Sequence, residues 1–221
     1  LRPGTSLRRS VLHRATLGRT SGQARKVDRH TRARLPAFST PPPMDRKLSM
    51  HELGRLELDA VRSMPKVPVR LLLDDVRSRH NVGAMFRTAD AFGLEGLLLC
   101  GFTPTPPHRE IEKTALGATA SVPWSHAPST LEAVQELKRA GYRVWCVEQT
   151  VQAVPLDRWR PGPGPVALVL GNELNGVADE VVAACDGAVM IPQHGIKHSL
   201  NVAVCAGVVV YQAVRLVASD H

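Results

Sequence analysis

The stretch VALVLGNELNG, residues 166–176, joins an apolar run directly to a turn rich in glycine and asparagine. The five apolar residues 166–170 indicate a short strand that is buried on both faces. The turn places backbone N–H and C=O groups and one carboxylate at the end of that strand. It matches neither the G-x-G-x-x-G of a dinucleotide fold nor a P-loop. Taken alone, it could also be a tight turn before a helix that begins near Val177.

Strand-like and helix-like segments alternate on both sides of this stretch. This alternation predicts an α/β fold in which a mostly parallel sheet is sandwiched by helices. In such sheets ligands bind at the carboxyl ends of the strands, so the loops there are the candidates for function. The expected strands are Val67–Leu73, Gly96–Cys100, Arg143–Val147, Val166–Leu170 and Ala188–Ile191; the expected helices are Asn81–Phe92, Ser129–Ala140, Val177–Cys185 and Ser199 to about Val217.

The net charge of +8 is concentrated at one end of the 221-residue chain. Residues 1–43 hold ten basic side chains against one acidic one, whereas residues 44–221 have a net charge of −1. We expect residues 1–43 to be a disordered basic extension, residues 44–66 a short helical segment and residues 67–221 the functional domain. The extension could be an upstream segment without a role, the product of a mis-set start before Met44, a basic arm that holds RNA, or an organellar transit peptide.

The cysteines and the apolar runs indicate the compartment. The four cysteines are scattered and form no C-x-x-C pair, which favours reduced thiols in a core over disulfides or a zinc site. The apolar run from Ser199 to Val214 has 16 residues, fewer than the roughly 18 that a membrane helix needs. We therefore expect a protein without a membrane span, in the cytoplasm unless the extension directs it to an organelle.

Two further loops carry polar side chains that suit a site. In the loop after the first strand, Asn81 is a candidate helix N-cap and Arg87 projects from the second turn, although a capped helix with a solvated arginine would look the same. In the loop before the last helix, Ser199 is a candidate cap and Asn201 could point its amide at a ligand. His194 and His198 flank Gly195, which indicates a loop, so no metal site is expected there.

The sequence resembles the SpoU (TrmH-like) RNA 2′-O-ribose methyltransferases of the SPOUT superfamily, from about Leu71 to Val214. Three motifs carry the resemblance, and their order and their spacing of about 80 and 20 residues make it specific, although each alone is weak. The first motif is met by Asn81, Gly83, Ala84, Arg87, Phe92 and Gly93, the second by Gly171, Asn172, Glu173 and Gly176, and the third by Ile191, Pro192, Ser199, Leu200, Asn201, Val202 and Ala203.

The resemblance implies a C-terminal trefoil knot that forms the pocket for S-adenosylmethionine, with no metal. It implies cofactor contacts at Val147, Gly171, Ile191, Ser199 and Leu200, and catalytic or organising roles for Asn81, Arg87, Glu173, Ser199 and Asn201. The implied acceptor is a ribose 2′-hydroxyl of tRNA or rRNA, and Arg87 would act as the base or, since a guanidinium rarely gives up its proton, as an electrostatic clamp. The implied assembly is a homodimer through the last helix, whose residues 200–210 are apolar on nearly every face.

Three other functions remain open at this point. The chain could bind the cofactor and RNA without catalysis, or methylate a base on the same scaffold. A hydrolase using Ser199 with His198 or His194 is disfavoured, because no G-x-S-x-G elbow surrounds Ser199. With a body of net charge −1, RNA would have to be held by local groups such as Arg77, Arg79, Arg87, Arg109 and Lys113.

Overall fold

The computed structural model describes residues 46–49, 51–54 and 57–218. The chain divides into two units, Leu1–Leu48 and Ser49–His221. Of the first unit only residues 46–48 are described, and they are exposed. The predicted basic extension, residues 1–43, therefore lies outside the described residues, and everything below concerns the second unit.

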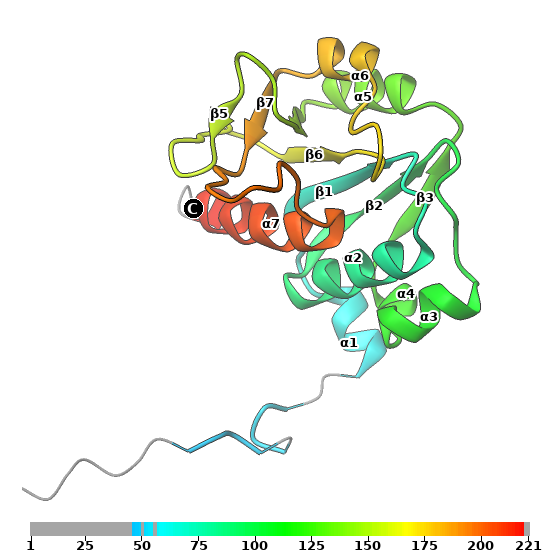
Figure 1. The fold of residues 1–221 in the computed structure, drawn as a ribbon. Coiled ribbons are helices and arrows are strands. Elements are labelled where there is room, and N and C mark those ends of the chain that lie inside the picture. Colours follow the sequence, from blue (N-terminus) through cyan, green and yellow to red (C-terminus); the bar gives the residue numbers. More distant parts are fainter. Residues whose placement is uncertain (1–45, 50, 55–56, 219–221) are drawn as a thin grey trace, which may run out of the picture. The chain divides into compact units, whose positions relative to one another are not determined.

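The second unit is built on a sheet of seven strands in the order β3-β2-β1-β6-β4-β7-β5, and every neighbouring pair is parallel (Figure 1). This confirms the predicted α/β class with a mostly parallel sheet. The sheet contains all five expected strands and adds the short β3 and β5. The bounds are β1 Val67–Asp74, β2 Leu94–Cys100, β3 Trp124–Ala127, β4 Arg143–Val147, β5 Val154–Pro155, β6 Val166–Leu170 and β7 Gly187–Met190.

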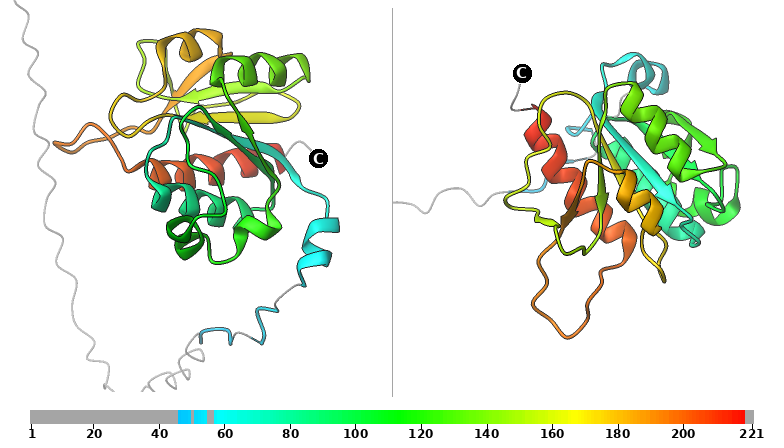
Figure 2. Two further views of the ribbon diagram at one scale, coloured as in Figure 1. Left: turned by 90° about the vertical axis from the view of Figure 1, so that its right-hand side faces the viewer. Right: turned by 90° about the horizontal axis from the view of Figure 1, so that it is seen from above.

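Helices cover both faces of the sheet (Figures 1 and 2). α2 and α7 pack on one face, and α5 and α6 on the other. Among the helices of the described part, α7 included, none combines the length and apolarity that crossing a bilayer takes. The bounds are α1 Leu58–Ser63, α2 Arg79–Ala91, α3 Arg109–Ala115, α4 Ala118–Ser121, α5 Thr130–Arg139, α6 Asp179–Ala184 and α7 Val202–Ala218.

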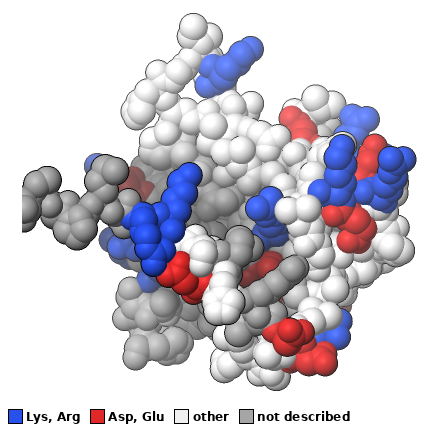
Figure 3. Space-filling model, turned by 90° about the horizontal axis from the view of Figure 1, so that it is seen from below, with Lys and Arg blue, Asp and Glu red and all other residues white. Residues whose placement is uncertain are grey.

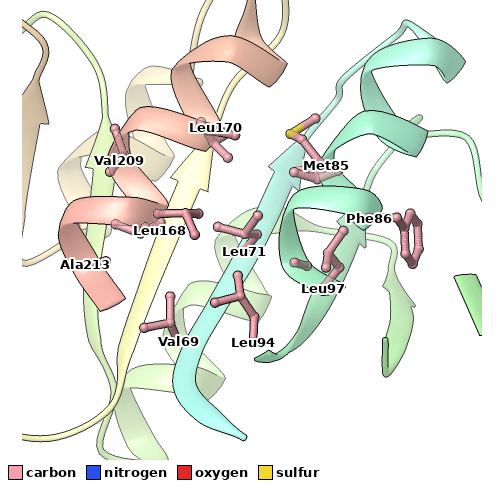
Figure 4. Close-up of a cluster of buried hydrophobic side chains, with 14 of the residues drawn as sticks. Val69, Leu71, Met85, Phe86, Leu94, Leu97, Leu168, Leu170, Val209 and Ala213 are labelled. Atoms are coloured by element: carbon pink, nitrogen blue, oxygen red, sulfur yellow. The ribbon is translucent and has the colours of Figure 1, made fainter. Parts of the chain in front are cut away.

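The central strand β1 shows why the chain forms two cores. Successive side chains of a strand point to opposite faces of its sheet. Leu71 and Leu73 accordingly belong to the core under α2 and α7, which Figure 4 shows, whereas Leu72 belongs to the core under α5 and α6. All three are fully buried. The apolar residues 71–73 of β1 are thus required by burial on both faces.

α1 lies in the segment that we expected to be a short N-terminal helical element. The side chain of Arg62 donates two hydrogen bonds to the carbonyl of Ala120, at 2.9 and 3.2 Å, and so attaches α1 to α4. Arg62 also lies 3.8 Å from Asp59, one turn earlier. Both side chains are largely exposed, so this ion pair contributes little to stability.

Gly83 allows α2 and α3 to pack closely. A Cβ at this position would lie 2.1 Å from Thr114 Oγ1 and 2.3 Å from the carbonyl oxygen of Ile111. We expect Gly83→Ala to lower the free energy of unfolding by about 1–3 kcal/mol, because the backbone of α3 must move away. Urea unfolding followed by circular dichroism would measure this, and a change below about 0.5 kcal/mol would contradict the packing argument.

Candidate functional site

A cavity of about 690 Å³ lies at the carboxyl ends of β4, β6 and β7, next to the first turn of α7. This is the edge of a parallel sheet where ligands are expected. Its volume is within the usual range for small-molecule sites. The residues that line it include all five predicted cofactor positions, Val147, Gly171, Ile191, Ser199 and Leu200, together with Glu173 and Asn201.

Gly171 is required where the wall of the cavity turns back on itself. It is buried, and a Cβ there would lie 2.1 Å from the carbonyl carbon of Gly176 and 2.2 Å from the nitrogen of Val177. Asn172 and Gly176 exchange two backbone hydrogen bonds of 2.9 Å, which close the turn. Geometry therefore explains the two glycines of the turn, because the end of β6 and the segment that returns to it lie too close together for a side chain.

Asn172 fixes this turn and ties it to β1. Its side-chain oxygen accepts hydrogen bonds from the N–H groups of Leu174 and Asn175, at 2.9 and 3.3 Å. Its amide nitrogen donates to the carbonyl of Asp75 at 2.7 Å. The second motif includes Asn172 but predicts no role for it. Asparagine side chains often bond the backbone of their own turn, and this tendency could have indicated the role.

Glu173 binds the loop that follows β1. Its carboxylate accepts hydrogen bonds from the N–H of Arg77 at 2.9 Å, the N–H of Ser78 at 3.0 Å and the side-chain amide of Asn81 at 2.9 Å. Burial on its own would raise the pKa of Glu173, but these hydrogen bonds lower it overall below the ordinary 4.5. The carboxylate is therefore ionised at neutral pH, and its oxygens are engaged with donors of the protein.

Asn81 does not cap its helix, contrary to our expectation. α2 begins two residues earlier, and its N-cap is Ser78, whose hydroxyl accepts a hydrogen bond from the N–H of Asn81 at 3.3 Å. Serine is as good a cap as asparagine, so the sequence alone does not choose between them. Because Ser78 performs the capping, the amide of Asn81 is available to Glu173.

The start of α7 also differs from the expectation. Asn201, not Ser199, caps this helix, since its side-chain oxygen accepts from the N–H groups of Ala203 and Val204 at 2.9 and 3.3 Å. Its amide nitrogen donates to the side-chain oxygen of Asn81 at 3.1 Å. Ser199 is exposed at the cavity and is therefore left to contact a ligand.

Asn81, Glu173 and Asn201 thus form a continuous hydrogen-bonded chain, called the amide–carboxylate chain below. Each member comes from a different predicted motif, so the structure brings the three motifs together. Asn81 uses both ends of its amide, one toward Glu173 and the other toward Asn201. The chain positions the β1–α2 loop and the start of α7 against the wall of the cavity.

Glu148 and Gln149, directly after β4, also line the cavity and bond to two of its other segments. The Glu148 carboxylate accepts from the N–H of Val177 at 3.1 Å, and a Cβ at Gly176 would lie 2.2 Å from that carboxylate. The Gln149 amide donates to the carbonyl of His198. Sequence reasoning assigned Val147 but missed these two residues, although the position directly after a predicted strand pointed to them. Burial and, less strongly, the charge of Glu148 raise the pKa of the Cys205 thiol in the same cavity to about 11.

Arg87 does not line this cavity. It is exposed on α2 and borders a separate groove of about 490 Å³, which Ala84, Thr88, Ala91, Phe92, Lys113, Thr114, Leu116 and Gly207 complete. Arg87 is thus the one predicted site residue that neither borders the large cavity nor belongs to the amide–carboxylate chain. Across the described ranges, no three or more His, Cys, Asp or Glu side chains are grouped so as to hold a metal ion.

The lowered pKa of Glu173 predicts a pH dependence of stability. A carboxylate whose pKa is depressed on folding stabilises the protein above its unfolded pKa, and this contribution is lost as the pH falls through the folded value. We expect Glu173→Gln to lower the melting temperature at pH 7, and the difference from wild type to shrink as the pH falls below 4.5. Thermal unfolding at several pH values, with the exposed Glu136→Gln as control, tests this; a difference of equal size at pH 3 and pH 7 would contradict it.

Comparison with known proteins finds relatives that are similar to this chain in sequence and in fold. The 23S rRNA (guanosine-2′-O-)-methyltransferase RlmB of Vibrio parahaemolyticus is 30% identical over 164 residues, which are 74% of this chain and 66% of that protein. The solved structure of the A. aeolicus TrmH/SpoU tRNA modifying enzyme is 27% identical with a TM-score of 0.66, over 74% of this chain and 82% of that one. The solved structure of an AdoMet-bound rRNA methyltransferase from Sinorhizobium meliloti is 29% identical with a TM-score of 0.64. The match covers 70% of this chain and 59% of that one.

The chain spans 66% or less of the length of the curated relatives that it matches first. The model of the SpoU rRNA Methylase family matches residues 68–211, which include almost the whole sheet, the cavity and the amide–carboxylate chain. Because this match covers well over half of the chain, and includes all three motifs, the chain belongs to the SpoU rRNA methylase family.

Proposed function

We propose that the chain is an S-adenosylmethionine-dependent RNA methyltransferase that transfers a methyl group to a ribose 2′-hydroxyl, in the cytoplasm and on rRNA or tRNA. The observation that carries the proposal is the amide–carboxylate chain, which joins all three motifs beside the 690 Å³ cavity. Family membership and the activities that the relatives are named for support the same reaction.

The cavity fits S-adenosylmethionine in size and in lining. Gly171 exposes backbone where a side chain has no room, and the loops at Val147, Ile191 and Leu200 offer backbone groups and apolar surface to an adenosine and a methionine moiety. The methyl donor would supply a methyl group that is already electrophilic, because it is attached to a positively charged sulfur. No metal is needed for this transfer.

The protein's own task is to orient the ribose and to help its hydroxyl lose a proton. Glu173 already accepts three hydrogen bonds from the protein, so we assign it and its two asparagine partners to holding the site together. Ser199, exposed at the cavity, would contact the donor or relay a proton to a phosphate. Arg87 would clamp the phosphate beside the target ribose and stabilise the developing alkoxide, or would serve as the base.

We further propose that the active protein is a homodimer packed through α7. Leu200, Val204, Val208 and Tyr211 are 41–55% exposed; the last three are spaced along one face of α7, and Leu200 lies just before its first turn. The ring of Tyr211 packs edge-on against Phe92, with ring centroids 6.3 Å apart, beside the groove that Arg87 borders. A second copy seated here would cover this apolar face and bring Arg87 into a shared site.

Val208→Asp tests the dimer. A negative charge in the middle of the apolar face should prevent association, because burying it costs free energy when no opposite charge or hydrogen-bond donor lies beside it. Light scattering should give the mass of two 24.0 kDa chains for the wild type and of one for the variant. Val151→Asp is the control. Val151 is fully exposed and lies outside α7, so this variant should remain dimeric. A wild type that elutes as a single chain would contradict the proposal.

The proposal includes the path of the C-terminal part, in which residues 191–201 would be threaded to form a trefoil knot. The support is family membership and the position of residues 198–202 against the 171–177 loop, since both segments border the same cavity. Gln149 holds this segment through the carbonyl of His198. A crystallographic trace in which residues 191–201 cross no enclosing loop would contradict the knot.

The decisive experiment is to map 2′-O-methyl sites in total RNA from cells with and without the gene. A ribose methylation that disappears with the gene would establish the activity and name the RNA, and an unchanged map would contradict the activity. Transfer of a radiolabelled methyl group to unmodified 23S rRNA and tRNA transcripts separates the enzyme from an RNA-binding protein without catalysis. Nucleoside analysis of the product separates ribose methylation from base methylation.

A further inference from the structure

Phe102 exposes an aromatic ring to solvent at the edge of the sheet that holds the site. Its side chain is 88% exposed, compared with 53% for Tyr211 and 37% for Trp124. It lies in the loop that follows β2, and the parallel strands place the carboxyl end of β2 at the same edge as those of β1 and β6. Such a ring offers a flat apolar face to a ligand, and its position at this edge, close to the candidate site, makes it of interest.

The backbone that carries this ring is fixed at several points. The N–H of Thr103 bonds to the carbonyl of Cys100, and Gly101 between them has a φ of +59°, as a turn of the II′ type requires. The His126 ring contacts the Gly101 carbonyl at 3.0 Å. The buried hydroxyl of Thr103 donates to the carbonyl of Leu73 at 2.8 Å and accepts from the N–H of Val76 at 3.0 Å. The turn therefore holds the ring outward on a rigid support.

Asp75 connects this turn directly to the candidate site. Its carboxylate accepts a hydrogen bond from the N–H of Phe102 at 2.7 Å, and its carbonyl accepts from the Asn172 amide at 2.7 Å. Two residues further on, the N–H of Arg77 donates to Glu173. Phe102 and the amide–carboxylate chain are thus both attached to the short segment 75–77.

Three arginines on the segments that follow β1 and β2, at this edge of the sheet, suit a nucleic acid. Arg77, Arg79 and Arg109, from the loop after β1 and the starts of α2 and α3, have exposed side chains. Arg79 lies 3.6 Å from Glu110, and both side chains are about half exposed, so water screens this pair and the guanidinium can still reach a phosphate. On the face of the molecule that is seen from below, Lys and Arg side chains lie in separate groups, and several of these groups have Asp or Glu beside them (Figure 3). Such local groups agree with the −1 net charge of residues 44–221.

We propose that Phe102 is a stacking platform for a nucleobase of the RNA substrate, next to the ribose that is methylated. Aromatic side chains on a rigid support bind bases of any sequence by stacking, and nearby arginines hold the backbone. The exposed face of the ring then becomes covered when RNA binds. This inference rests on the proposed function, because it needs RNA as the substrate.

The experiment compares Phe102→Ala, Phe102→Leu and Phe102→Trp in the full chain. Binding is measured by fluorescence anisotropy with a labelled 20-nucleotide single-stranded RNA of mixed sequence, and methyl transfer with unmodified rRNA and tRNA transcripts. The alanine and leucine variants should weaken RNA binding by about tenfold and raise KM for RNA by a similar factor. The tryptophan variant should stay within about twofold of wild type, because it keeps a stacking face. Val151→Ala, on an equally exposed apolar side chain, is the control.

Melting temperature and S-adenosylmethionine affinity should be unchanged in all variants, since Phe102 does not border the cavity. Alanine or leucine variants that bind RNA as the wild type does would overturn the inference, as would a tryptophan variant that is as weak as alanine. A wild-type protein that binds RNA through Phe102 but transfers no methyl group would overturn the proposed function, and with it the place of Phe102 beside a methylated ribose. If the Phe102 variants transfer methyl groups to RNA as fast as the wild type does, the proposed function stands and the inference is overturned.

Discussion

Replacing Arg87 by alanine is expected to lower the rate of methyl transfer by about a hundredfold or more, which is the usual cost of removing a group that stabilises developing negative charge. Binding of S-adenosylmethionine should be unchanged, because Arg87 borders a separate groove. Isothermal titration with the methyl donor and a radiolabelled transfer assay measure the two effects independently. Loss of transfer with full donor binding would place Arg87 on the acceptor side of the reaction.

Arg87→Lys separates the two roles considered for this residue. A lysine keeps a positive charge for the phosphate but loses the planar fork of the guanidinium, so a clamp should retain part of the rate. Arg158→Ala, an exposed arginine in the segment between β5 and β6, controls for the loss of one surface charge and should be as active as wild type. An Arg87→Ala variant with near-normal turnover would exclude both roles.

Gly171→Ala is expected to abolish binding of the methyl donor and to destabilise the fold by about 1–3 kcal/mol or more. The added Cβ would lie 2.1 Å from the carbonyl carbon of Gly176, which is backbone that cannot rotate away. The returning chain must therefore move, and with it the wall of the cavity. Titration of S-adenosylmethionine into the variant, together with its melting temperature, measures both consequences.

Gly195→Ala is the matched control for this prediction. Gly195 lies in the loop that leads to α7, and a Cβ there has no atom within 4 Å. It does not border the cavity, so donor affinity should stay within about twofold of wild type and melting should be unchanged. If Gly171→Ala bound the donor as tightly as Gly195→Ala, the contact between the two ends of the 171–176 turn would not shape the cavity.

The sequence predicted the strands that are buried on both faces and missed those that are not. β1, β2, β4, β6 and β7 each contain a run of apolar residues, which burial under two helix layers requires. β3 reads WSHA and lies at the edge of the sheet, where its first three side chains are exposed. An edge strand needs no apolar run, so its pairing with β2 is decided by the fold as a whole. β5 has only two residues, too few for any pattern.

The motifs predicted most of the residues that gather at the cavity, with Arg87 as the exception, and the structure supplied how they are connected. Asn81, Glu173 and Asn201 were named from the sequence, but the caps of α2 and α7 were each assigned to the wrong neighbour. Ser78 and Asn201 are ordinary capping residues within three positions of the expected ones, and local propensity does not separate such neighbours. A tertiary contact decides between these neighbours, because the side chain of Asn81 donates a hydrogen bond to Glu173, which lies 92 residues away in the sequence.

The amide–carboxylate chain has a consequence for how the protein matures during synthesis. Its two hydrogen bonds join residues that are 92 and 120 positions apart. Closing such long loops costs entropy before any contact compensates for it, and the chain leaves the ribosome from its N-terminal end. A nascent chain held before residue 201 has every strand of the sheet and both partners of the Asn81–Glu173 bond, but lacks the bond from Asn201 to Asn81. We therefore expect the candidate site to be completed in one late step, when the start of α7 emerges and docks.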